Sequence, residues 1–369
     1  MINKERLLHT FCDYVRIDSE STHEKEMARR LIADLSALDC EICIDDSMTE
    51  TGSDTGNLYC TLPGTAPGEP LILSAHMDTV APGIGVQPVI RDGYVYSDGT
   101  TVLGSDNKAA VAAIVEVFRT LVEHRFPHPT IQAVFTVMEE RHVVGANHLE
   151  YDRLSAKRAL VLDCTGDVGT VITQAPGLVM LSATMTGRSA HAGIAPETGI
   201  SAIQAMGHAI ANMKLLRIDH ETTANIGTFS SHYSTNVVPE KAELQAEARS
   251  LNPEKLEAQV SHMVQCLEDA GRQFGAQLHL ETETCYQPFN IPHDDNFLAE
   301  VHAACDRLGL PFSVVSSGGG SDANCFNQHG IKALVLGIGM ENIHSTRERI
   351  SIENLNNLAA LILCVLSHH

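Results

Sequence analysis

The order of helical and extended patterns changes twice along the chain, and this change constrains the fold more than any other feature of the sequence. Up to about residue 176, helical periodicity alternates with short apolar runs, as in an open α/β sheet. From Gly177 to Thr284 the order becomes strand, helix, two strands, helix and strand, which is typical of a ferredoxin-like unit. After Pro288 the α/β rhythm resumes. We predict a large domain at 1–176 and 288–369 and a smaller α+β domain inserted at 177–287.

The run Leu71–Ala75 places apolar side chains on both faces of a strand. Such a run is typical of a strand that is covered on both sides, as in parallel sheets. We expect the large domain to contain a mostly parallel, mixed sheet flanked by helices. Its other elements include strands at Ile131–Val137, Ala159–Leu162 and Lys332–Leu336 and a helix at Asn107–Glu123.

Charge and hydropathy exclude two classes of partner. A formal net charge of -21 repels phosphate backbones, and the sequence has no basic stripe interleaved with aromatic residues. No apolar run approaches the roughly 18 residues that a membrane span needs, and the first residues contain no apolar signal core. We expect a cytoplasmic protein that binds neither nucleic acid nor membrane.

The ten cysteines are scattered, which favours reduced core residues over a disulfide framework. Cys40 and Cys43 form a CxxC pair, but a structural zinc site needs four ligands, and neither a second CxxC nor a histidine cluster is nearby in the sequence. The pair is predicted to belong to a strand.

His76 and Asp78 follow directly on the apolar run, at the carboxyl end of a predicted strand. Open α/β sheets build their sites at this end of their strands. Alternation along the strand puts both side chains on one side, and a carboxylate in that place can orient an imidazole ligand. A capped turn is the structural alternative.

Further candidates follow other predicted strands. Glu139 and Glu140 come after Ile131–Val137, and adjacent buried carboxylates are costly unless they share a cation or a proton. Asp106 precedes a long helix, so an N-cap would also explain it. Asp163 and His344, which also follow predicted strands, are ordinary when taken alone.

The convergence of these residues at one edge of the sheet is what predicts a site. Two histidines and several carboxylates, with no cysteine among them, suit a pair of zinc, cobalt or manganese ions bridged by one carboxylate. Such a pair lowers the pKa of water and polarises a carbonyl, while one carboxylate remains as general base. We therefore predict a hydrolase that uses two divalent metal ions.

Four stretches, in order along the chain, resemble the zinc-dependent M20 metallopeptidases, and within them the peptidase T (tripeptidase) branch. The similarity extends over nearly the whole chain, including the inserted domain. Four motifs in order are far more specific than any one of them. The stretches are Ser74–Val80, Gly104–Lys108, Met138–Glu140 and Asn342–Ser345.

The resemblance implies a role for each matching position in a catalytic metal-binding domain. Asp106 would bridge the metals, Glu140 and His344 would complete one site, and Asp78 would orient His76. Glu139 would be the general base, and the Asp106–Asn107 peptide would be cis. The implied metal ligands are His76, Asp106, Glu140, Asp163 and His344.

The inserted domain resembles the family's lid and dimerisation domain, which implies a homodimer. His191, in the segment 187–193, resembles a histidine that stabilises the oxyanion, within its own chain or across the dimer. Asn236 and Arg249 resemble contacts to a substrate carboxylate; for Arg249 a surface ion pair is the alternative. The turn 318–322 resembles the family's glycine-rich turn beside the site.

One departure affects specificity more than chemistry. After Glu140 the family often has an apolar residue and glycine, whereas this chain has Arg141 and His142. We predict an aminopeptidase or tripeptidase that acts on short peptides. The alternatives are an amidohydrolase that removes an acyl or carbamoyl group from an amino acid, and a catalytically silent binding protein on the same fold.

Overall fold

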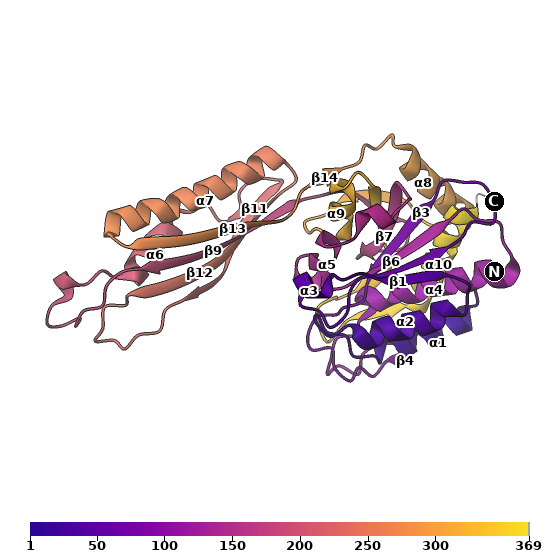
Figure 1. Cartoon of the computed structure of the whole chain (residues 1–369), viewed down its shortest axis with the longest axis horizontal. Coiled ribbons are helices and arrows are strands. Elements are labelled where there is room, and N and C mark those ends of the chain that lie inside the picture. Colours follow the sequence, from indigo (N-terminus) through magenta and orange to yellow (C-terminus); the bar gives the residue numbers. More distant parts are fainter. Residues whose placement is uncertain (368–369) are drawn as a thin grey trace. The chain divides into compact units, whose positions relative to one another are not determined.

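The computed structural model describes residues 1–367, and its contacts divide the chain into two units (Figure 1). The first unit contains Met1–Gln174 and the chain from Asn290 onward. The second unit is Ala175–Phe289, a single inserted segment. The last two residues of the segment 288–369, which was predicted to belong to the large domain, lie outside the described residues.

The first unit is built on a mixed sheet. Within the described residues its nine strands are β1 (Glu41–Ile44), β2 (Leu58–Leu62), β3 (Leu71–His76), β6 (Ile131–Thr136), β7 (Arg158–Cys164), β8 (Thr170–Ala175), β14 (Phe289–Asn290), β15 (Ser313–Ser316) and β16 (Lys332–Gly337). Their order is β1-β2-β6-β3-β7-β16-β8-β14, with β15 paired to β8. The central strands β6, β3, β7 and β16 run parallel, so their carboxyl ends meet at one edge. The predicted fold class is confirmed.

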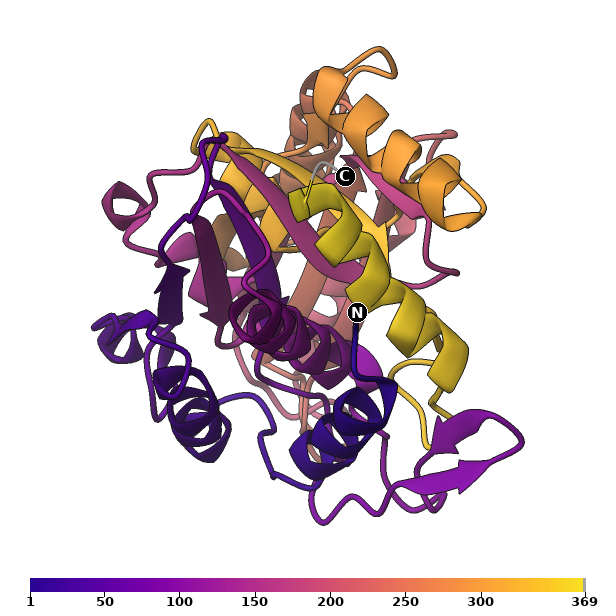
Figure 2. The same cartoon turned by 90° about the vertical axis from the view of Figure 1, so that its right-hand side faces the viewer.

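Helices cover this sheet, as its burial requires. They are α1 (Lys4–Val15), α2 (Lys25–Ser36), α3 (Met48–Thr51), α4 (Ser105–His124), α5 (Val144–Asn147), α8 (Asn296–Leu308), α9 (Asp322–Gln328) and α10 (Ile352–Ser367). α4 packs on β3 and β7 and is flanked by α1 and α10 (Figure 2), while α9 packs on β7 and β16. β3 is buried at every position, as its apolar run predicts for a strand covered on both faces.

A smaller sheet in the first unit joins two distant parts of the sequence. Its antiparallel strands are β4 (Val89–Arg91), β5 (Tyr94–Tyr96), β17 (Met340–Glu341) and β18 (Arg349–Ser351). β18 pairs with β5, which holds the loop between β17 and β18 against the part of the chain that leads into α4. This loop contains His344.

The second unit is an antiparallel sheet with two helices. Its strands are β9 (Gly177–Thr186), β10 (Leu216–Arg217), β11 (Thr222–Ser230), β12 (Lys241–Ser250) and β13 (Gln277–Tyr286), and its helices are α6 (Ala202–Asn212) and α7 (Pro253–Phe274). The order β10-β11-β12-β9-β13 gives the predicted ferredoxin-like arrangement. The side chain of Asn252 accepts a hydrogen bond from the backbone of Lys255, and Pro253 follows it, so α7 begins with a capped first turn.

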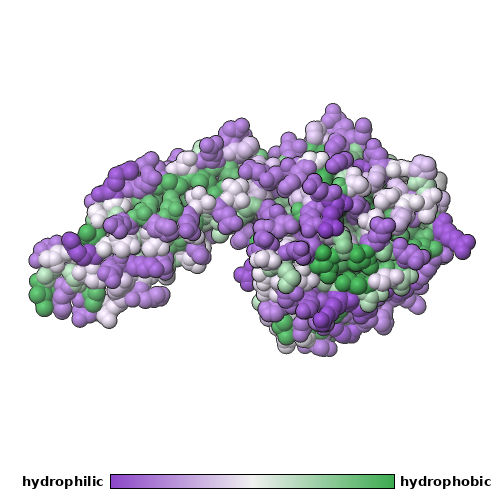
Figure 3. Space-filling model, viewed as in Figure 1, coloured by the Kyte–Doolittle hydropathy of each residue, from purple (hydrophilic) through white to green (hydrophobic). Residues whose placement is uncertain are grey.

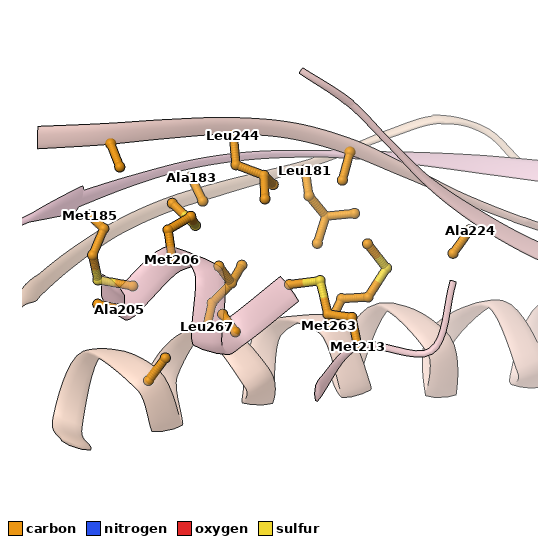
Figure 4. Close-up of a cluster of buried hydrophobic side chains, with 14 of the residues drawn as sticks. Leu181, Ala183, Met185, Ala205, Met206, Met213, Ala224, Leu244, Met263 and Leu267 are labelled. Atoms are coloured by element: carbon orange, nitrogen blue, oxygen red, sulfur yellow. The ribbon is translucent and has the colours of Figure 1, made fainter. Parts of the chain in front are cut away.

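The core of the second unit is apolar throughout (Figure 4). Inward residues of β12 alternate with exposed ones, which puts Leu244 in the core beside Leu181 of β9. Met206 of α6 and Met263 and Leu267 of α7 pack against them. Every second residue of the strands and one face of each helix thus contribute side chains to the same apolar cluster.

The surface is largely hydrophilic in the view of Figure 3, with smaller hydrophobic areas on both units. No helix in the described part of the chain is long and apolar enough to span a membrane. Cys43 lies in β1 and Cys40 directly precedes it, so the CxxC pair belongs to a strand region.

Candidate active site

The predicted site residues of the first unit lie where the central strands end. His76 is the last residue of β3, and Asp163 is the next-to-last residue of β7. Glu139 and Glu140 lie in a single helical turn, Glu139–Arg141, three residues after β6. Asp106 lies in the first turn of α4, where its φ and ψ are not helical, and the Asp106–Asn107 peptide is cis.

Asp106 lies between the two histidines. Its Oδ1 is 3.1 Å from Nε2 of His76, and its Oδ2 is 3.3 Å from Nε2 of His344. Each carboxylate oxygen therefore faces a different imidazole. This is the arrangement that a carboxylate bridging two cations requires.

Two more carboxylates extend this arrangement, one beside each histidine. Nε2 of His344 lies 3.1 Å from Oε1 of Glu140, and Nε2 of His76 lies 3.7 Å from Oδ1 of Asp163. Two groups of side chains have ligand atoms that all lie within 4.8 Å of one another. One contains His76, Asp106 and Glu140, and the other contains His76, Glu139 and Asp163. Proximity alone does not separate two sites, so the separation rests on the two oxygens of Asp106.

Asp78 holds both His76 and the turn that carries Glu139. Nδ1 of His76 donates to the backbone carbonyl of Asp78 at 2.9 Å and lies 3.4 Å from its carboxylate. A carbonyl can only accept, so Nδ1 carries a proton and Nε2 can serve as the ligand atom. The Asp78 carboxylate also accepts from the backbone amides of Glu139 and Glu140, at 3.0 and 3.2 Å, and from Ser21 Oγ at 2.6 Å.

The carboxylates of this edge repel one another. Burial, and then the nearby charge of Asp163, raise the pKa of Glu139 well above its ordinary value. Burial also raises the pKa values of Glu140 and Asp163. The pKa of Asp106, which burial alone would raise, is instead lowered by its hydrogen bonds to His344 and His76.

The pKa values of the two histidines are also raised, which favours their protonated, positively charged form. Hydrogen bonds to Asp106 and Glu140 raise the pKa of His344 to about 10. Burial disfavours a charged His76, but hydrogen bonds to Asp106, Asp163 and Asp78 outweigh it and raise its pKa well above the ordinary value. In the absence of a cation, protons on the imidazoles therefore balance part of the negative charge.

A pair of divalent cations fits this set of residues. Imidazole nitrogens and carboxylate oxygens are the donors that zinc, cobalt and manganese accept. Carboxylates outnumber the two imidazoles, so protons on the histidines cannot neutralise the site, whereas two divalent ions can. Glu139, whose pKa is raised among these carboxylates, would become a stronger acid when cations offset that repulsion.

Sequence reasoning gave no individual role to three buried carboxylates around the site, although one of them, Asp322, belongs to the turn 318–322 that it placed there. Glu24 accepts from the backbone amide of Met138 at 3.1 Å, and Asp322 accepts from Oγ1 of Thr136 at 2.6 Å. Glu348 binds the segment that carries Asp106. Glu24 precedes a helix, Asp322 begins one and Glu348 lies in a loop, so local pattern gives each an ordinary explanation. The one signal in the sequence was that Glu348 lies four residues after the proposed ligand His344.

The predicted residues of the second unit are not all brought together. His191 and Val237 form a bridge, and the amide of Ala192 donates to the carbonyl of Asn236, so His191 and Asn236 lie in adjacent, exposed segments. Arg249 lies elsewhere, at the end of β12, and its Nε and Nη2 bind the carboxylate of Glu247 at 2.9 and 3.0 Å. The predicted surface ion pair of Arg249 is therefore present.

Arg141 is exposed, as is His142, which takes a left-handed backbone conformation with a φ of 69°. That conformation favours glycine, the residue that the family often has near this point. The glycine-rich turn leads into α9, where Ser321 and Asn324 form a capping box.

The family of the chain follows from comparison with known proteins. A sequence model described as Peptidase family M20/M25/M40 matches residues 72–368. The chain belongs to this family. The resemblance inferred from the four motifs is thus confirmed, and the M20 peptidase fold accounts for the mixed sheet and the separate antiparallel unit.

Three similar proteins cover the chain almost completely. The uncharacterized protein YqjE of Bacillus subtilis is 42% identical over 366 residues, which are 99% of each chain. The crystal structure of the aminopeptidase PepT from Bacillus cereus is 42% identical with a TM-score of 0.91, covering 99% of this chain and 98% of that one. The crystal structure of a tripeptidase from Staphylococcus aureus is 40% identical with a TM-score of 0.95, covering 100% and 99%.

Proposed function

We propose that the protein uses two divalent metal ions to hydrolyse a peptide bond in short peptides, as an aminopeptidase or tripeptidase. The observation that carries the proposal is the placement of Asp106, with one carboxylate oxygen toward each histidine. The two solved structures near 40% identity, described as an aminopeptidase and a tripeptidase, support this substrate class over others.

The metal ligands in this proposal divide around Asp106. His76 and Asp163 would hold one ion with it, and Glu140 and His344 would hold the other, as the distances between these side chains allow. Zinc suits this nitrogen and oxygen set, and cobalt or manganese are the alternatives. The ion pair would supply Lewis acidity to the scissile carbonyl and lower the pKa of water between the ions.

Glu139 acts as the general base. It takes a proton from the attacking water and delivers that proton to the leaving amine, so one carboxyl group serves both transfers. Asp78 positions it, because the Asp78 carboxylate binds the amide of Glu139 while it also holds His76. Asp78 therefore positions both the proposed ligand His76 and the proposed base Glu139.

In this proposal His191, Asn236 and Arg249 of the second unit contact the substrate. Their positions relative to β12 limit which of them can do so together. The segments of His191 and Asn236 meet near the start of β12, where Lys241 pairs with Thr186, whereas Arg249 pairs with Leu178 at the other end. Eight residues of strand span about 26 Å, while an extended tripeptide is about 10 Å long. This separation favours two different chains as the source of the two groups.

We propose that the protein is a homodimer in which His191 acts on the site of the partner. Mixing Glu139→Gln with His191→Ala chains tests this, because neither variant alone has an intact site. In a random mixture, half of the dimers contain one of each chain, and one of their two sites is intact if His191 acts across the dimer. About a quarter of wild-type activity is then expected, whereas none is expected if His191 acts within its own chain.

A substrate panel tests the reaction. Metal-loaded enzyme is incubated with dipeptides, tripeptides and N-terminally blocked tripeptides, and separately with N-acyl and N-carbamoyl amino acids. Turnover of free tripeptides in preference to blocked ones supports the proposal. Turnover confined to acyl or carbamoyl amino acids would replace it with the amidohydrolase alternative, and a metal-loaded protein inert toward both sets would favour a silent binding protein.

A further inference from the structure

Glu348 is a buried carboxylate in the loop between β17 and β18, and its side chain is saturated with hydrogen bonds. Oε2 accepts from the backbone amides of Leu103 and Gly104 at 2.8 and 2.9 Å. Oε1 accepts from Oγ of Ser105 at 2.6 Å and from the backbone amide of Asp106 at 3.0 Å. Only 1% of the residue is exposed. Burying this charge is tolerable because each oxygen has two donors.

These donors belong to the chain segment that presents Asp106. The segment 103–106 leads into α4, and the first amides of a helix have no acceptor within the helix. Gly104, at the N-cap with a φ of 75°, supplies no side-chain acceptor. Glu348 provides the missing acceptors from more than 240 positions away in the sequence.

Glu348 is also connected to His344, the proposed ligand that faces Asp106. Glu348 lies four residues after His344, and its backbone amide donates to the carbonyl of Ser345 at 3.0 Å. Nε2 of His344 in turn faces Oδ2 of Asp106 at 3.3 Å. One side chain therefore fixes the bridging carboxylate relative to the loop that carries the histidine.

We propose that Glu348 is a positioning residue for the metal pair, which orients the segment 103–106 so that Asp106 presents one oxygen to each ion. The inference rests on the proposed two-metal function. Both oxygens of Glu348 are taken up by the segment 103–106, so its effect would pass through the backbone of Asp106. Three of the four partners are backbone amides, which can only donate, and the Ser105 hydroxyl also donates here, so the position favours a group that only accepts.

Glu348→Gln is the informative variant, since it keeps the size of the side chain but turns one acceptor into a donor. Turned one way, its NH2 group would face the backbone amides of Leu103 and Gly104, and turned the other way it would still face the backbone amide of Asp106 beside the Ser105 hydroxyl. We expect metal affinity to fall roughly 10- to 100-fold, as it does for other residues that hold metal ligands in place. The measurements are calorimetric titration of the chelator-treated protein with zinc and the visible absorption spectrum of the cobalt-loaded protein.

Two further variants are matched controls. Glu341→Gln removes the same charge close to His344, but the Glu341 carboxylate binds Arg349 rather than the segment of Asp106, so metal affinity should match wild type. Ser105→Ala removes one of the four donors and should weaken metal binding less than Glu348→Gln. Excess metal should restore turnover to Glu348→Gln with an unchanged KM, which a general loss of folding would not allow.

The outcomes separate the inference from the function on which it rests. Wild-type protein that binds two ions, together with a Glu348→Gln variant of equal affinity and identical cobalt spectrum, would overturn the inference and leave the proposed function standing. Wild-type protein that binds no metal would overturn both. If Glu348→Gln does not fold, Glu348→Asp and Ser105→Ala test the inference instead. It then requires metal affinity to fall as hydrogen bonds between residue 348 and the segment 103–106 are removed.

Discussion

The core of the inserted unit is buried, and so are Asp78 and Glu348, the two side chains that anchor the proposed metal edge of the large unit, but different forces hold them. The inserted core is a cluster of apolar side chains, such as Leu181, Met206 and Leu267, that exclude water without directional bonds. At the metal edge, Asp78 and Glu348 are equally buried, and each is held by several donors. An apolar core tolerates change at a cost in stability, whereas a polar network depends on each donor. Mutations should therefore separate stability from chemistry.

The largest effect is expected at the metal edge, in Glu139→Gln. Removal of the general base should lower kcat by roughly 10²- to 10⁴-fold, with metal content close to that of wild type. The metal-free variant should also resist urea better than metal-free wild type, because a neutral side chain avoids both the burial of a charge and the repulsion by Asp163 that raise the pKa of Glu139. Steady-state kinetics, elemental analysis and urea unfolding check the three parts. Full activity would refute the mechanism.

The inserted core should show the opposite behaviour. Leu267→Ala removes a fully buried side chain and should cost about 2–5 kcal/mol of unfolding free energy. Leu216→Ala is the matched control, because Leu216 is 71% exposed and its loss should cost little. Both proteins should keep wild-type metal content. A Leu267→Ala variant that lost metal, but not stability, would contradict the distinction between the two regions.

Metal removal should make the stability of the polar edge depend on pH. In the metal-free protein the pKa of His344 is raised from 6.5 to about 10 by Asp106 and Glu140, so the folded state holds this proton more tightly than the unfolded state. The resulting stabilisation is complete below pH 6.5 and is lost as the pH rises toward 10. Urea midpoints of chelator-treated protein should fall over this range.

Two controls belong to this pH experiment. The metal-loaded protein should not show the decline, because the ions replace the protons and bind better as the pH rises. His344→Gln should show a smaller decline than wild type without metal. Equal slopes in wild type and His344→Gln would mean that this histidine does not carry the effect.

The smallest effect is expected from Arg249→Lys in the inserted unit. If Arg249 binds the substrate carboxylate, the loss of its planar fork should raise KM about tenfold, or about 1.4 kcal/mol, and leave kcat unchanged. A tripeptide amide provides the control, because wild type should bind it as weakly as the variant does. An equal effect of the variant on acid and amide would assign Arg249 to its ion pair with Glu247 instead.

The fold could be predicted where the pattern is local. The apolar run Leu71–Ala75 predicted a strand of the right type, with bounds close to those of β3, Leu71–His76. The small sheet of β4, β5, β17 and β18 was missed, because its strands have two or three residues and all positions of β4 are exposed. Its pairing joins Tyr96 to Arg349, which no local pattern encodes.

The candidate site divides in the same way. His76, Glu139 and Asp163 could be placed because they follow strands, and parallel strands bring their carboxyl ends to one edge. Asp322 was included only as part of the turn 318–322, and Glu348 was not singled out, because their importance depends on contacts with Thr136 and the segment 103–106, at 186 and more than 240 positions away. Asp322 illustrates the difficulty, because burial raises its pKa to about 7 although its sequence context is an ordinary helix start.

The central claim is that Asp106 bridges two ions, and metal stoichiometry tests it most directly. The protein is stripped with chelator, titrated with zinc and assayed on a tripeptide at each step, beside an Asp106→Asn variant. The account predicts near two ions per chain for wild type, activity that returns with the metal, and the loss of tight binding of both ions in the variant. One ion or none per chain in wild type, or a variant that still binds two ions tightly, would contradict it.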